Sequence, residues 1–192
     1  SSLLNGNKIT VNSGAVAKEL QAKYPELTSV SITLPLFSHR PIVYVEPAQP
    51  SLLLSTTYGN YIVDANGRVL AQDTAQKSVS ALNLPHVTDQ SGIRPVVGKQ
   101  AMPATTVQFI HIVQTELAAK QIATSVMVLP PASSQLNVYI SGVSYYVKFN
   151  LQSGTARKQS GTYLATRANL AGQGITPAEY IDVRVEGRAY YK

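Results

Sequence analysis

The sequence predicts an α+β fold, in which a helix–strand–strand module precedes a larger antiparallel sheet domain with two helices. Apolar residues spaced four apart predict helices, and runs that alternate apolar with polar residues predict half-buried strands. Asn66-Gly67 between two apolar runs predicts a hairpin, because both residue types tolerate positive φ. With 192 residues and 44% hydrophobic content, the chain can bury one substantial core or two small ones.

The first section, residues 1–50, reads as helix, strand, strand. Asn12 precedes the apolar residues Val16 and Leu20, and the pattern breaks at Pro25. A capping side chain, one apolar face and a terminal proline together predict a short helix.

Two strands follow this helix. Residues 30–34 alternate apolar with polar side chains, residues 35–41 predict a turn, and residues 42–45 form a second apolar run. Prolines then interrupt the chain, and we place a domain boundary near residues 47–51, so that residues 51–192 form the second domain.

The second section opens with an apolar run at residues 52–54 and the Asn66-Gly67 hairpin, whose turn Asp64 begins. Residues 73–102 predict loops and short strands, and residues 103–120 form the longest helix candidate, with one apolar face. The remaining predicted elements are strands at residues 122–129, 136–140 and 145–151, a helix at 154–170, and strands at 180–185 and 188–191.

The chain ends on the last two of these runs, which Glu186 and Gly187 separate. A sheet that finishes at such a strand offers an unpaired edge, which either carries protective features or recruits another chain. Tyrosines there supply large amphipathic contact area. We therefore predict a partner-binding edge that consists of Tyr180, Ile181, Asp182, Val183, Arg184, Arg188, Ala189, Tyr190 and Tyr191.

Composition argues against several classes of protein. The absence of cysteine excludes disulfides, thiolate catalysis and Cys-ligated zinc. The net charge of +6 comes from scattered basic residues, so we expect no nucleic-acid binding. No apolar run is long enough to span a membrane. Because the chain begins Ser-Ser-Leu without an initiator methionine, we expect it to be part of a longer protein.

No catalytic or metal-binding pattern is present, so we expect no enzyme activity, no metal and no cofactor. His39, His86 and His111 lie far apart, and neither a nucleophile elbow nor a phosphate-binding loop occurs. Asp182 and Arg184 are two residues apart in a strand, which predicts an ion pair on one face of the sheet.

Several short motifs follow one family pattern in order. These are Pro-Glu-Leu-Thr-Ser-Val-Ser-Ile at residues 25–32, Arg-Pro-Ile-Val-Tyr-Val-Glu-Pro-Ala-Gln-Pro at 40–50, and Tyr-Ile-Val-Asp-Ala-Asn-Gly at 61–67. They resemble the end of a POTRA domain, and the start of the domain after it, in the cell-division family FtsQ/DivIB. Tyr-Ile-Asp-Val-Arg at 180–184, with Arg188 beyond it, resembles the Ile-Asp-Leu-Arg signature near the C-terminal end of that family.

The resemblance spans nearly the whole chain, with a partial POTRA-like module because residues 1–11 stand where another strand and helix belong. It implies a single-pass membrane protein whose transmembrane helix is absent from this chain, and whose extracytoplasmic part this chain would be. The family is not catalytic. It links FtsB- and FtsL-like division proteins to the septal wall synthase, and a partner segment adds to the sheet edge of the C-terminal β domain.

Two alternatives stay open. One is a POTRA-containing module of a secretion or outer-membrane assembly system, in which repeated POTRA units or a following β-barrel would be expected. The other is an extracytoplasmic enzyme, in which His, Asp and Glu side chains would cluster in a pocket.

Overall fold

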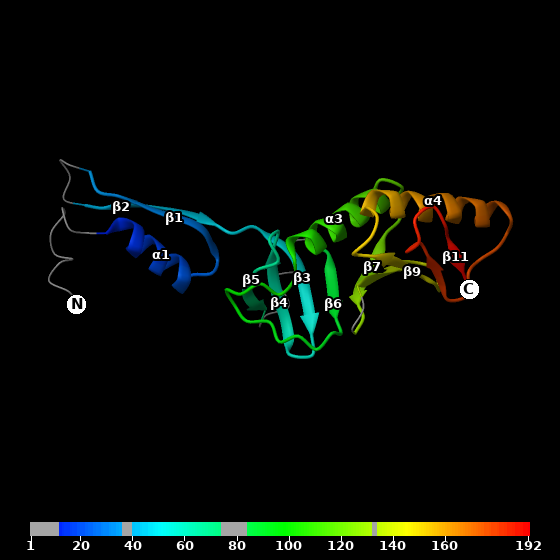
Figure 1. The fold of residues 1–192 in the computed structure, drawn as a ribbon, viewed down its shortest axis with the longest axis horizontal. Coiled ribbons are helices and arrows are strands. Elements are labelled where there is room, and N and C mark those ends of the chain that lie inside the picture. Colours follow the sequence, from blue (N-terminus) through cyan, green and yellow to red (C-terminus); the bar gives the residue numbers. More distant parts are fainter. Residues whose placement is uncertain (1–11, 36–39, 74–83, 132–133) are drawn as a thin grey trace.

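The computed structural model describes residues 12–35, 40–73, 84–131 and 134–192 of the chain. It shows the predicted α+β fold, with a two-stranded sheet near the N-terminus and a nine-stranded sheet beyond it. In Figure 1 the N-terminal elements form a thin extension at one end, and helices lie along one face of the larger sheet. The predictions for residues 1–11, and parts of those for residues 35–41 and 73–102, lie outside the described residues.

The N-terminal module consists of α1 (Ser13–Lys23), β1 (Leu27–Thr33) and β2 (Ile42–Pro47), with β1 and β2 antiparallel. The predicted cap is present, because the Asn12 side chain accepts a hydrogen bond from the Ala15 N–H at 3.0 Å. The module buries little, since α1 has no fully buried residue and all of β2 is exposed. Its stability therefore owes little to a core of its own.

The first sheet ends and the second begins within residues 47–51, where the sequence predicts a domain boundary. β2 ends at Pro47 and β3 (Pro50–Thr56) begins the larger sheet, while the Ala48 N–H donates to the Glu26 carbonyl at 2.7 Å. Every described residue of the buried core cluster lies at Leu52 or later in the chain.

This distribution leads to a prediction for the fragment 48–192. It should unfold cooperatively with nearly the same melting midpoint as the whole chain, because it retains all of the described buried core. Thermal unfolding followed by circular dichroism compares the two chains. A fragment that lacks a cooperative transition would show that the two modules share one folding unit.

The nine-stranded sheet has the order β11-β10-β9-β8-β7-β6-β3-β4-β5. Besides β3, its strands are β4 (Gly59–Asp64), β5 (Val69–Asp73), β6 (His86–Asp89), β7 (Thr124–Leu129), β8 (Gln135–Ile140), β9 (Tyr146–Asn150), β10 (Tyr180–Asp182) and β11 (Tyr190–Tyr191). The predicted hairpin joins β4 to β5, and Asp64 Oδ1 accepts hydrogen bonds from the N–H groups of Asn66 and Arg68.

Most neighbouring strands are antiparallel, as predicted, but β3–β6, β6–β7 and β9–β10 are parallel. Two of these pairs flank a helix in the chain: α3 (Ala104–Ala118) connects β6 to β7, and α4 (Ala156–Gly172) connects β9 to β10. A helical crossover returns the chain to the end of the sheet where it started, so the next strand runs parallel. The sequence patterns predicted both helices correctly, whereas the parallel direction of the strand after each helix was not predicted.

Both helices cover one face of the sheet and form the core with it (Figure 1). The predicted apolar face of α3 is buried, with Val107, Ile110, Val113 and Leu117 all at most 1% exposed. Phe109 of α3 meets Phe149 of β9 edge-to-face, with 6.2 Å between ring centroids. The core thus fixes the two helices, and through them the strands that each helix precedes.

One buried polar side chain ties α4 to the end of β9. Gln159 is 4% exposed, and its amide accepts from the Asn150 N–H at 2.8 Å. It also donates to the carbonyls of Asn150 and Ser153 at 2.8 and 2.9 Å. Three backbone groups next to α4 are therefore satisfied by one amide.

Gln159→Ala should lower the free energy of unfolding by about 2–4 kcal/mol, because it leaves buried backbone groups without partners. Gln173→Ala is the matched control, since its exposed amide bonds only the Asn169 side chain, and it should change stability by less than about 0.5 kcal/mol. Urea denaturation measures both variants. Equal stabilities would mean that water replaces the Gln159 amide without cost.

Candidate functional site

The predicted terminal strand pair is present but shorter than expected. β10 and β11 are antiparallel, with Ile181 opposite Tyr191 and Asp182 opposite Tyr190. Gly187 adopts φ +70° in the turn between them, which the Arg188 N–H closes by donating to the Val185 carbonyl at 3.1 Å. β11 is the end strand of the nine-stranded sheet.

The backbone hydrogen bonds show which groups of β11 face outward. The Lys192 N–H donates to the Tyr180 carbonyl at 3.1 Å, and the Lys192 carbonyl accepts from the Glu179 N–H at 2.8 Å. Because backbone groups of successive strand residues point to opposite sides, the N–H and carbonyl of Tyr191 face away from β10. The N–H and carbonyl of Ala189, two residues earlier, face the same way as those of Tyr191.

The opposite end of the sheet, at β5, is partly covered. The Val69 N–H donates to the Lys99 carbonyl at 2.9 Å, and the Val69 carbonyl accepts from the Gly98 N–H at 2.8 Å. Arg68 and Gln100 form an isolated bridge beside them. In the part of the chain that the structure describes, β11 therefore offers the less protected edge.

The side chains of the predicted site divide into two groups. Ile181 and Val183 are at most 1% exposed and belong to the core, so they hold β10 in place and cannot contact a partner directly. Tyr190 and Tyr191 are 51% and 50% exposed. Arg188 is also exposed. The remaining four predicted residues are partly buried: Tyr180, Asp182, Arg184 and Ala189.

The predicted ion pair joins Asp182 and Arg184 in a two-bonded arrangement, with Nη2 to Oδ2 at 2.7 Å and Nε to Oδ1 at 2.9 Å. Arg184 also donates to the Gln135 side chain on β8 at 2.7 Å. Burial raises the pKa of Asp182, but the hydrogen bonds and charge of Arg184 outweigh burial and leave this pKa below its usual value. The pair thus connects the end of β10 to β8.

A row of tyrosines crosses the strands toward β11. Tyr139 of β8 stacks on Tyr146 of β9 with 5.0 Å between centroids, and Tyr146 lies 6.2 Å from Tyr180 of β10. Lys148 Nζ lies 3.4 Å from the centroid of the Tyr180 ring. Sequence reasoning missed this row, although alternation along each strand placed these tyrosines on one face; the strand order was the missing information.

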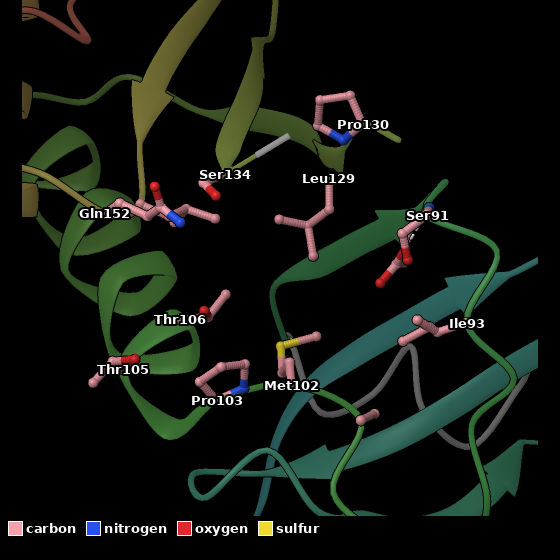
Figure 2. A pocket seen from close by; sticks show the side chains of 13 residues that line it. Ser91, Ile93, Met102, Pro103, Thr105, Thr106, Leu129, Pro130, Ser134 and Gln152 are labelled. Atoms are coloured by element: carbon pink, nitrogen blue, oxygen red, sulfur yellow. Dashed lines mark hydrogen bonds between the residues drawn. The ribbon is translucent and has the colours of Figure 1, made fainter. Parts of the chain in front are cut away.

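A cavity of about 510 Å³ lies at the carboxyl ends of β6 and β7, beside the start of α3 (Figure 2). Met102, Leu129 and Thr106 line it, together with Asp89, whose carboxylate accepts from the Ser91 N–H at 2.7 Å. Part of its wall comes from residues 91–102, a stretch that predicted loops and short strands. Asp89 closes the strand end through this local bond, a structural role that needs no ligand.

Two histidines contact serines, which the sequence did not suggest. Ser51 Oγ lies 2.6 Å from His111 Nε2, and Ser55 Oγ lies 2.7 Å from His86 Nε2. Ser55 also donates its proton to Asn60 Oδ1 at 2.6 Å, so its oxygen accepts from His86 and gains no nucleophilic character. Within the described ranges, no group of three His, Asp or Glu side chains is placed to hold a metal ion.

These features define a mixed sheet domain whose end strand β11 has no backbone partner on its outer side among the described residues, and such a structure can bind by accepting a further strand. No protein-family model and no curated protein matches this chain. None of the helices in the described ranges has the length and apolar character needed to cross a membrane.

Proposed function

We propose that this chain is a non-catalytic extracytoplasmic scaffold of the bacterial cell-division machinery, and that it binds FtsB- or FtsL-like partners through the outer edge of β11. The observation that carries the proposal is the uncovered outer edge of β11, to which Tyr191 directs its N–H and carbonyl. The Ile-Asp-Val-Arg motif just before it, which resembles the FtsQ/DivIB signature, supports the choice of partner.

The proposed binding mode is the addition of one strand. A partner strand beside β11 would satisfy the outward groups of Tyr191 and Ala189, and main-chain bonds of this kind supply affinity without a preformed pocket. Tyr190 and Tyr191 would supply contact area on the two faces of the extended sheet, because successive strand residues point to opposite faces.

The location is part of the same proposal. Anchoring would come from a single membrane-spanning segment outside this chain, as the family resemblance implies. The order of elements supports this assignment, because the helix–strand–strand module precedes the larger sheet domain as in the family pattern.

The test is a titration of the chain with an FtsB-like segment encoded by the same genome, with a scrambled segment as control. The proposal expects saturable binding to the native segment alone, and slower amide hydrogen exchange at Tyr191 and Ala189 in the complex. Protection at β5 instead, or no binding of the native segment, would refute the proposed mode.

A further inference from the structure

A second cavity, of about 250 Å³, lies beside the C-terminal half of α4 and the start of β10. Its walls are mainly apolar, with Val143, Leu170, Ile175 and Ile181 among the lining residues. Leu170 and Ile181 belong to the buried core, whereas Ile175 is 38% exposed. The cavity is thus lined both by core residues and by a partly exposed apolar side chain.

One charged side chain, Arg167 of α4, lines this apolar space. It is half-buried, and no carboxylate in the described ranges lies within ion-pair distance of it. Arg157 on the same helix differs, because it is exposed and pairs with Glu116 at 2.7 Å. A guanidinium that is partly desolvated without a carboxylate partner favours an anionic ligand beside it.

Two buried tyrosines are also relevant to this cavity. Tyr145 lines the cavity and is 5% exposed, and Tyr163, one turn before Arg167 on α4, is fully buried. The Tyr163 hydroxyl has no hydrogen-bond partner of normal geometry among the described residues. Burial raises the pKa of Tyr163, nearby Tyr145 adds to the rise and the charge of Arg167, one helical turn further along α4, opposes it.

We propose that this cavity binds a small apolar carboxylate, with the hydrocarbon part between Leu170 and Ile181 and the carboxylate beside Arg167. The guanidinium and a tyrosine hydroxyl both donate hydrogen bonds, so their side of the cavity selects an acceptor with negative charge. The ligand is either the C-terminal residue of a peptide or a free branched-chain acid, since the two share this chemistry. The proposal is independent of partner binding at β11.

The test uses N-acetyl-L-leucine as probe, N-acetyl-L-leucinamide as its uncharged match, and 4-methylpentanoate as a free acid without a peptide group. Nuclear magnetic resonance titration of the whole chain should show saturable shifts at Arg167 and Leu170 with the first probe, with a Kd on the order of 1 mM for a ligand of this size. The uncharged match should bind at least about tenfold more weakly. Equal binding of 4-methylpentanoate would identify a free acid as sufficient, and its failure would favour a peptide C-terminus.

Variants separate this cavity from general charge attraction. Arg167→Gln should weaken binding of N-acetyl-L-leucine at least about tenfold, whereas Arg157→Gln on the same helix should leave it unchanged. Ala171→Phe, at an exposed lining position, should block the cavity and weaken binding while the melting midpoint stays near that of the parent. Equal affinity for the acid and its amide, an unaffected Arg167→Gln variant, or no saturable shift up to ~10 mM probe would overturn the proposal.

Discussion

Ala189→Pro should weaken binding of an FtsB-like segment at least tenfold while leaving the domain folded. Ala189 lies two residues before Tyr191, whose N–H and carbonyl face the outer edge, so the N–H of Ala189 is directed the same way along the extended chain. Proline removes the outward N–H of Ala189, and one lost main-chain bond at a binding edge is worth about 1.5 kcal/mol or more. Isothermal titration calorimetry measures the loss.

The control at the same position is Ala189→Ser, which keeps the N–H and nearly the same volume. It should bind within about twofold of the parent, because the added hydroxyl leaves the main chain unchanged. Tyr190→Ala tests the side chain and should weaken binding less than the proline does, through lost apolar contact. A folded proline variant that binds as well as the serine variant would move the partner site away from β11.

Gly67→Val should destabilise the domain by about 2–5 kcal/mol, the largest effect expected for an exchange in a turn. Gly67 adopts φ +78°, and a Cβ there would lie 1.9 Å from the Met102 carbonyl oxygen. The Ala101 N–H also donates to the Gly67 carbonyl at 2.8 Å, so the turn and the segment before α3 are fixed to each other. Relief of the clash would therefore disturb both.

Gly142→Val is the matched control, because Gly142 has nearly the same φ, +79°, and no atom within 4 Å of an added Cβ. This variant should lower the free energy of unfolding by only about 1–2 kcal/mol, the strain of holding a valine in the left-handed backbone conformation. Urea denaturation of both variants gives the difference. Equal losses would show that the Met102 segment moves away without cost.

Much of this fold was predictable because its signals are local. The Asn12 cap, the apolar face of α3 and the Asp64–Gly67 turn each depend on side chains a few residues apart, and the structure confirms all three. The close approach of Met102 to Gly67 was not predictable, because it joins segments more than thirty residues apart.

The candidate sites show the same limit. The tyrosines of β11 were recognised from their position in the chain, but the core role of Ile181 and Val183 required knowledge of which face α4 covers. In the sequence, Arg167 is one of three basic residues in the helix predicted at 154–170, with nothing to distinguish it from Arg157 and Lys158. Only the packing of α4 beside Ile181 places it in an apolar cavity without a carboxylate.

The parallel pairing of β9 with β10 has a consequence for how the protein is made. β10 reaches its place only after α4 has crossed the sheet, and among the described strands β11 pairs only with β10. Because the ribosome produces the earlier strands first, a nascent chain cannot present the outer edge of β11 until the rest of the domain is complete. A partner that recognises this edge would therefore engage completed domains and ignore those still emerging or arrested midway.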